Sequence, residues 1–149
     1  MSLNISMKNS IIADTGFWYA LINEEDSFHR QAIIALKKID GELISTWPVI
    51  TETSYLLQSR LGLQHVCAFL TSYYEGLFAI YEFSSEQLLR MIGLMQKYAD
   101  LPMDLTDASL VVLAEELGHG RILSTDMRDF KTYCWKNHHP FHNLLLPDS

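Results

Sequence analysis

The sequence predicts an α/β domain built around a mainly parallel sheet. Strand-like and helix-like segments alternate along the 149 residues, without internal repeats or low-complexity tracts. Apolar residues make up 48% of the chain and charged residues 19%, which suits a compact globule rather than a disordered chain. The length fits one core, so we expect a single domain over residues 1–149.

Two short strands and three helices are expected in the first half of the chain. The strands are apolar runs that stop at polar residues, and the helices have apolar side chains three or four positions apart. Gly41 and Gly62 follow the last periodic residues of two helices and are expected to end them. In order, the expected elements are strand 10–13, helix 17–22, helix 27–39, strand 43–46 and a helix that Thr51 and Glu52 open.

The second half continues the alternation. Aromatic and β-branched residues favour a third strand, and Ser84-Ser85-Glu86 is typical of a helix start. Asp107 is expected to start a further helix that ends at Gly118, and a fourth strand then stops at Asp126. In order, the expected elements are helix 66–73, strand 77–83, a helix from Ser84 through Met95, helix 107–118, strand 121–125 and an edge strand within 141–147.

The overall charge and apolar pattern exclude two classes of protein. A net charge of −7 argues against a protein that holds nucleic acid on a broad basic surface, but not against an enzyme that meets phosphate through metal ions. No apolar run approaches the length needed to span a bilayer. The amino-terminal residues do not have the layout of a secretion signal, so we expect a cytoplasmic protein. Cys67 and Cys134 are expected to be two unpaired thiols.

Four acids are expected at one edge of the sheet. Asp14 and Asp126 each follow an apolar strand, whereas Glu52 and Asp107 are expected in the first turns of helices. In an open parallel sheet, the carboxyl ends of strands and the amino ends of the following helices meet on one edge, where ligands bind. Taken singly, Glu52 and Asp107 are explained as helix caps favoured by the helix dipole. Taken together, the four acids favour a functional site.

Carboxylates that converge in one pocket need protons or a cation. Two of them about 4 Å apart repel by about 4 kcal/mol at an effective dielectric constant of about 20. The acidic motifs contain no matching set of Lys or Arg. Hard oxygen donors suit Mg²⁺ or Mn²⁺ rather than zinc, and such ions activate water and stabilise the leaving oxygen in phosphodiester cleavage. The residues alone therefore predict an acidic metal site suited to phosphoryl chemistry.

At these residues the chain resembles the PIN-domain ribonucleases, and most closely the VapC toxins of bacterial toxin–antitoxin pairs. The likeness lies in four stretches in the family's order, residues 11–16 with 26–29, 51–57, 98–110 and 124–130. The resemblance implies a three-layer α/β/α sandwich with a mainly parallel central sheet, and cleavage of RNA that depends on Mg²⁺ or Mn²⁺. It also implies a homodimer and, in toxins, a small VapB-like antitoxin protein that blocks the acidic pocket.

The resemblance also assigns roles by position. It makes Asp14, Glu52 and Asp107 the core metal ligands, and Asp126 the fourth acid, which places a second metal ion or a water. Asp104 lies one helical turn before Asp107 and ranks below these four. Three roles stay open for Asp104: a metal ligand, an acid that supports a ligand, or a loop cap.

Other residues are expected to assist the site or to have structural roles. The hydroxyls of Thr15 and Thr125 adjoin the first and fourth acids and are expected to orient a carboxylate or a water. The cluster of His138, His139 and His142 lacks the spacing of a metal site and contains a proline, so we expect a surface loop there.

Some alternatives for aromatic residues and for function stay open. Trp18, Tyr19 and Trp47 flank the acidic residues in sequence; core packing is the default, but an exposed one can stack a nucleobase. Two alternatives to a toxin remain. One is a PIN-type nuclease that acts in RNA processing or on flapped DNA without an antitoxin. The other is an inactive PIN-like module that only binds a partner.

Overall fold

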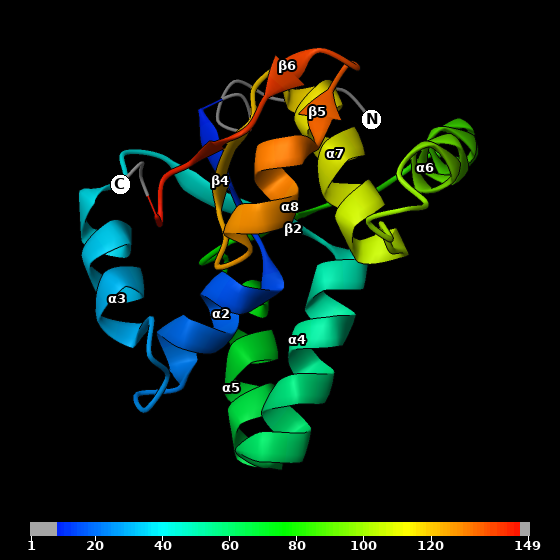
Figure 1. Cartoon of the computed structure of the whole chain (residues 1–149). Helices are drawn as coiled ribbons and strands as arrows, with labels where there is room; N and C mark the ends of the chain where they lie inside the picture. Colours follow the sequence, from blue (N-terminus) through cyan, green and yellow to red (C-terminus); the bar gives the residue numbers. More distant parts are fainter. Residues whose placement is uncertain (1–8, 147–149) are drawn as a thin grey trace.

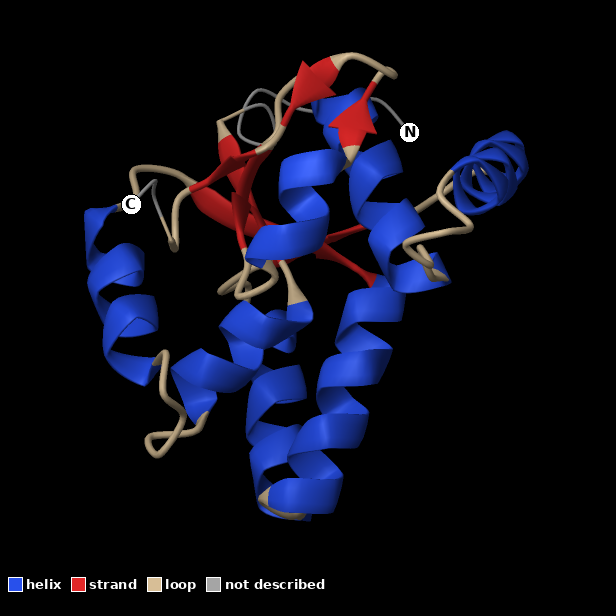
Figure 2. Ribbon diagram, in the orientation of Figure 1, coloured by secondary structure: helices blue, strands red, loops and turns tan. Residues whose placement is uncertain are grey.

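The computed structural model describes residues 9–146, with the side chains of residues 127–129 left out. Its centre is a five-stranded sheet flanked by helices (Figures 1 and 2). The strands are β1 (Ser10–Ala13), β2 (Glu42–Thr46), β3 (Ala79–Tyr81), β4 (Arg121–Leu123) and β7 (His142–Asn143). Their order is β3-β2-β1-β4-β7, and every neighbouring pair is parallel. The predicted α/β sandwich with a parallel central sheet is confirmed.

Helices connect the strands and cover the sheet. Two of them, α4 and α5, contact each other and extend together away from the sheet in Figure 1. Helix α7 contacts β2, α4 and α6, so it is buried on nearly every side. The helices are α2 (Thr15–Ile22), α3 (His29–Lys38), α4 (Trp47–Arg60), α5 (Leu63–Tyr74), α6 (Ser85–Lys97), α7 (Leu105–Leu117) and α8 (Met127–Thr132).

The start of α4 differs from the prediction. The helix begins at Trp47, four residues before the expected start at Thr51. Thr46 caps it by accepting a 3.4 Å hydrogen bond from the Val49 N–H, and Pro48 lies in the first turn, where its missing N–H costs nothing. Glu52 therefore lies in the second turn, not the first, and the explanation of Glu52 as a helix cap was wrong.

The start of α7 also differs. Asp104, not Asp107, caps this helix, because its Oδ1 accepts a 2.8 Å hydrogen bond from the Asp107 N–H. Asp107 is the third helical residue, and its carboxylate does not serve as the cap. The expected start of α6 is confirmed, since Ser84 and Gln87 form a capping box.

The last part of the described chain contains short elements. The predicted edge strand is confirmed as β7, which pairs with β4 through His142 and Asn143. The hairpin of β5 (Cys134–Trp135) and β6 (His139–Pro140), together with α8, was not predicted. His139 lies in this hairpin rather than in the expected loop, while His138 is exposed in the connecting turn. Pro147 lies outside the described residues.

The core lies on both sides of the sheet. Trp18 of α2 packs edge-on against Phe69 of α5, and its ring centroid is 4.6 Å from that of Phe78. Complete burial of one large apolar side chain contributes about 1.5–3 kcal/mol, so these rings fix the position of α2 at the end of β1. Over residues 9–146, no helix combines the length and apolar character that a membrane crossing requires. That residues 1–149 form a single domain stays a prediction.

Candidate active site

Asp14 follows the carboxyl end of β1, the middle strand of the sheet, and is 7% exposed. Its Oδ1 accepts a 2.7 Å hydrogen bond from the Thr15 N–H, and its Oδ2 accepts a 2.9 Å hydrogen bond from the Ser124 hydroxyl. Burial raises the pKa of Asp14 to about 6 against these two hydrogen bonds, and the negative charges of Asp126 and Glu52 add to the rise.

Ser124 connects Asp14 to Asp126 and was missed in the sequence. Besides donating to Asp14, its Oγ accepts a 2.9 Å hydrogen bond from the Asp126 N–H. Asn143 of β7 binds the backbone of Ser124 on both sides, accepting from its N–H at 3.2 Å and donating to its carbonyl at 2.8 Å. The position of Ser124, directly after a strand and two residues before an acid, was a usable signal. The contribution of Asn143 had no such signal.

Asp107 is the second acid with a strongly altered pKa. Burial raises the pKa of this half-buried carboxyl to about 8, and the charges of Asp104, Asp14 and Asp126 add to the rise. The phenol of Tyr133 opposes this effect by donating a 3.2 Å hydrogen bond to Asp107 Oδ2. Tyr133 is completely buried and was also missed in the sequence.

The charges of the other three predicted acids act on Asp14 or Asp107. Glu52, half-buried on α4, acts on Asp14, while Asp126 acts on both Asp14 and Asp107. The four carboxylates thus lie at the same edge of the sheet although they are far apart in sequence. Among the residues described, however, no three Asp, Glu, His or Cys side chains are close enough together to hold a metal ion as they stand.

Although the Thr15 N–H binds Asp14, the hydroxyls of Thr15 and Thr125 form no hydrogen bond with an acid among the described residues. The Thr15 hydroxyl is buried and has no hydrogen-bond partner within the described part of the chain. Thr125 packs against Gly16, where an added Cβ would overlap with Thr125 Oγ1, so this close approach requires glycine. The expected role of both hydroxyls in orienting a carboxylate or a water stays a prediction.

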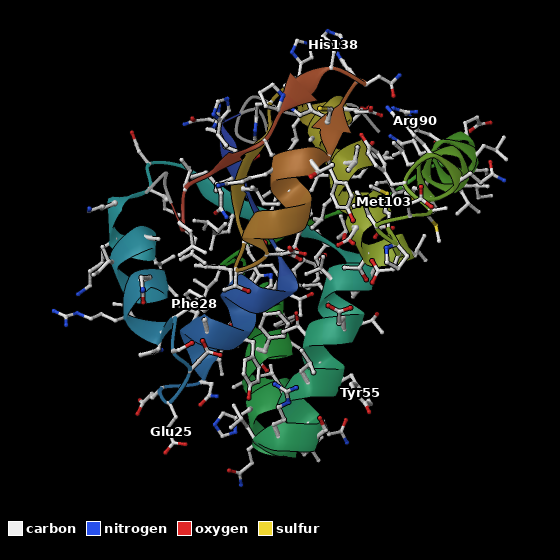
Figure 3. All side chains as sticks on the ribbon, in the orientation of Figure 1. Glu25, Phe28, Tyr55, Arg90, Met103 and His138 are labelled. Carbon is white, nitrogen blue, oxygen red and sulfur yellow. The ribbon has the colours of Figure 1, made fainter. Side chains whose placement is uncertain are left out.

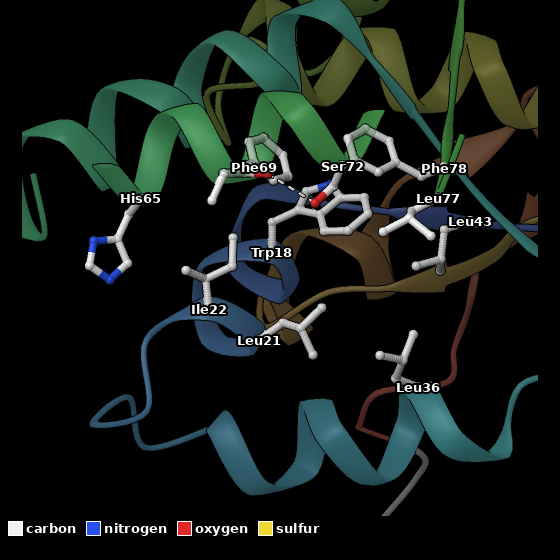
Figure 4. A pocket seen from close by; sticks show the side chains of 11 residues that line it. Trp18, Leu21, Ile22, Leu36, Leu43, His65, Phe69, Ser72, Leu77 and Phe78 are labelled. Atoms are coloured by element: carbon white, nitrogen blue, oxygen red, sulfur yellow. Dashed lines mark hydrogen bonds between the residues drawn. The ribbon is translucent and has the colours of Figure 1, made fainter. Parts of the chain in front are cut away.

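A separate apolar cavity of about 350 Å³ opens between α2, α3 and α5 (Figure 4). Its lining contains no carboxylate, so it offers no ligands for a hard metal ion. It is suited instead to apolar side chains or apolar ligands. The residues that line it are Trp18, Leu21, Ile22, Leu36, Leu43, His65, Ala68, Phe69, Ser72, Leu77 and Phe78.

Comparison with known families identifies the family and the fold. The sequence profile of the PIN domain matches residues 11–136, which include all four acids. This chain belongs to the PIN-domain family. PIN domains are typically nucleases and typically use divalent metal ions.

A solved structure supports the assignment at the level of the fold. The chain is similar to Mycobacterium tuberculosis VapC20, which is described as a toxin that cleaves the Sarcin-Ricin loop. The two share 19% sequence identity with a TM-score of 0.74, over 79% of this chain and 91% of the VapC20 chain. No curated protein matches this PIN domain by sequence.

The donors at the acidic edge of this PIN domain fit a divalent ion. All four predicted ligands are carboxylates, the hard oxygen donors that Mg²⁺ and Mn²⁺ prefer. Asp14 and Asp107 have raised pKa values partly because other carboxylates lie nearby, and a bound cation would offset that repulsion. Asp104 uses Oδ1 to cap α7, which leaves its second oxygen for another partner.

Proposed function

We propose that this PIN domain is a metal-dependent endoribonuclease that hydrolyses RNA phosphodiester bonds. One observation carries the proposal: carboxylates from four separate segments lie at the carboxyl edge of a parallel sheet, where the charges of the neighbouring acids add to the raised pKa values of Asp14 and Asp107. Such a group is costly to fold, since like charges at short distance repel, and structural needs do not account for it. The fold shared with VapC20, which is described as a Sarcin-Ricin loop cleaving toxin, adds support.

In this proposal Asp14, Glu52, Asp107 and Asp126 hold Mg²⁺ or Mn²⁺, with Asp104 ranked below them. When bound, the metal ion supplies an activated water and stabilises the leaving oxygen of the phosphodiester. The chain's own residues keep the carboxylates in place. Ser124 and the Thr15 N–H hold Asp14, and Tyr133 holds Asp107.

The proposal is tested by induced expression of the wild type and of Asp14→Asn, followed by sequencing of cellular RNA 5′ ends. New 5′ ends are expected with the wild type only, and they also reveal the substrate. Asp40→Asn is the matched control, because Asp40 is exposed just before β2, at the opposite end of the strands. Equal cleavage by purified protein in excess EDTA contradicts the metal requirement.

We further propose that the protein is a cytoplasmic homodimeric toxin with a small antitoxin partner. Leu88, Leu89 and Ile92 on α6 are exposed and offer an apolar face to a second copy. The cavity of Figure 4 offers an antitoxin a place for apolar side chains beside α2, the helix that Asp14 caps. Sequencing next to the gene tests this: a short reading frame that encodes a DNA-binding amino end would favour the toxin over a nuclease of RNA processing.

The loose arrangement of the acids favours one alternative, a PIN-like module that binds a partner without catalysis. No three metal-binding side chains of the described residues are close enough to hold an ion. Calorimetric titration with Mn²⁺ separates the two functions. A nuclease shows a stoichiometric site that Asp14→Asn and Asp107→Asn abolish, whereas an inactive module shows no such site.

A further inference from the structure

An open hollow of about 670 Å³ lies directly beside the acidic edge, along α4. Glu52 contributes to both, since it lines the hollow and also raises the pKa of Asp14. The first turn of α7 closes the other side through Leu105 and Thr106. The lining residues are Trp47, Pro48, Thr51, Glu52, Tyr55, Leu105 and Thr106.

Trp47 presents an aromatic ring in this hollow in a fixed orientation. Its Nε1 donates a 3.1 Å hydrogen bond to Glu82, and the edge-to-face contact with Tyr73 has a centroid distance of 5.9 Å. These contacts hold the indole from two sides, yet 41% of the residue remains exposed. A ring that is already ordered loses little conformational entropy when a flat ligand stacks on it.

Tyr55 is the second exposed aromatic residue of the hollow. It is 71% exposed and projects outward from α4 (Figure 3). It lies eight positions after Trp47, which is about 12 Å along a helix that rises about 1.5 Å per residue. One base cannot stack between two rings that far apart, so each ring would serve a different base.

The charges around the hollow favour stacking over ionic binding. None of the described residues that line it is Lys or Arg, and the acids next to it repel phosphate. Arg90, a cation of α6, already forms a salt bridge with Glu115 at 2.8 Å. Affinity for RNA within the hollow itself must therefore come from contacts other than ion pairs with Lys or Arg. Stacking of bases on aromatic rings is such a contact and tolerates any sequence.

We propose that this hollow binds unpaired RNA bases next to the cleaved bond, with Trp47 and Tyr55 as the stacking platforms. The inference rests on the proposed RNA cleavage at the adjacent acids. It adds a requirement for single-stranded or splayed-out nucleotides, because paired bases do not expose their faces.

The test measures binding of a mixed pool of short, fluorescent single-stranded RNAs, by anisotropy. An Asp14→Asn background keeps the RNA from being consumed. Trp47→Ala and Tyr55→Ala are each expected to weaken binding by about five-fold or more, as expected for one lost stacked base. Tyr55→Phe keeps the ring and is expected to bind within about two-fold of the parent. Tyr74→Ala is the matched control, since Tyr74 is 89% exposed but lies on α5 away from the hollow.

A second measurement maps contacts directly. RNA that contains 5-iodouridine forms photo-crosslinks with aromatic side chains, and peptides joined to Trp47 or Tyr55 are expected. Unchanged binding of both alanine variants overturns the inference, as do crosslinks confined to other segments. Sedimentation of the same variants shows whether a second copy covers the hollow instead. Loss of a dimer in Trp47→Ala and Tyr55→Ala also overturns it.

The failure of this inference differs from the failure of the proposed nuclease function. If the wild type cleaves RNA but the aromatic variants bind like their parent, only the stacking site is wrong. If RNA binds through Trp47 and Tyr55 but the wild type does not cleave it with Mn²⁺, the stacking site stands and the nuclease function is wrong.

Discussion

The hydroxyl of Ser124 donates a 2.9 Å hydrogen bond to Asp14 Oδ2, which joins the ends of β4 and β1. The Ser124 hydroxyl oxygen also accepts a hydrogen bond from the Asp126 N–H, so this one small side chain fixes two of the acids. The hydrogen bond from Ser124 to Asp14 lowers the pKa of Asp14, against the stronger effect of burial. Ser124 thereby helps Asp14 to remain ionised.

Replacing Ser124 should therefore lower activity without unfolding the protein. We expect Ser124→Ala to reduce RNA cleavage by about ten-fold, since one charge-assisted hydrogen bond is worth about 1.5–3 kcal/mol. Ser124→Thr keeps the hydroxyl and should retain more activity. Ser59→Ala, an exposed serine on α4, is the control. Initial cleavage rates at saturating Mn²⁺ measure the effect, and equal rates for Ser124→Ala and the wild type contradict it.

The acids should make the metal-free protein less stable as pH rises. The pKa values of Asp14 and Asp107 are raised to about 6 and about 8, so the folded state keeps protons that the unfolded chain releases. Their contribution to the free energy of unfolding therefore falls from about pH 4 and levels off above about pH 8. At pH 8, the free energy of unfolding of Asp14→Asn should exceed that of the wild type by up to about 3 kcal/mol, from about two pKa units at 1.4 kcal/mol each.

Urea unfolding of the wild type and of Asp14→Asn, in EDTA across this pH range, measures the difference. Effects of the other titrating groups cancel in the comparison. A constant difference between the two proteins from pH 4 to pH 8 would show that the pKa of Asp14 is not raised in the folded state.

A divalent ion should reverse this loss of stability. Binding to the folded state alone stabilises it by about 2.7 kcal/mol when the ion is at 100 times its dissociation constant. For a chain of this size, that raises Tm on the order of 5 °C. Scanning calorimetry with and without Mn²⁺ measures the shift. Asp107→Asn should lose it and Asp40→Asn should keep it; no shift in the wild type contradicts a metal site.

Two substitutions of Asp104 separate its capping role from a role in the acidic site. Asp104→Asn keeps an acceptor for the Asp107 N–H, so stability should be retained while a negative charge that raises the pKa of Asp107 is lost. Asp104→Ala removes the cap and should cost about 1 kcal/mol. Activity of Asp104→Asn decides the question. If Asp104→Asn cleaves RNA as fast as the wild type, Asp104 is a cap only. A large loss of its cleavage activity makes Asp104 part of the acidic site.

Gly16 should tolerate no side chain while Thr125 is present. An added Cβ would overlap with Thr125 Oγ1, so Gly16→Ala must displace either the start of α2 or the loop that leads to Asp126. Gly16→Ala is expected to lower both Tm and cleavage. The double variant Gly16→Ala with Thr125→Ala removes the overlapping atom and should recover most of the Tm. If the double variant is no more stable than Gly16→Ala, another contact is responsible.

The sequence predicted the parallel sheet and the common edge of the acids because strand ends and glycine stops are local signals. Helix starts were less reliable. Thr46 as a cap and Pro48 in the first turn indicate a helix start at Trp47, but the later Thr51 was predicted as the start. At Asp107, two acids one turn apart offered equally good caps, and only the backbone distinguishes Asp104 as the cap.

Contacts between distant segments were beyond prediction. Tyr133, which donates to Asp107, and Asn143, which donates to Ser124, lie among residues that have no periodic pattern. The predicted edge strand that contains Asn143 is only two residues long, too short for alternation to show which of its side chains faces the acids. Polar residues on short elements are found only once the fold brings them to the acids.

The position of Asn143 in the chain has a consequence during translation. Every one of the four acids leaves the ribosome before Asn143, whose side chain fixes Ser124 from the edge strand β7. A nascent chain that has exposed residues only as far as Asp126 therefore lacks the strand that braces its acidic edge. Assembly of the braced acidic edge therefore waits until Asn143 has left the ribosome.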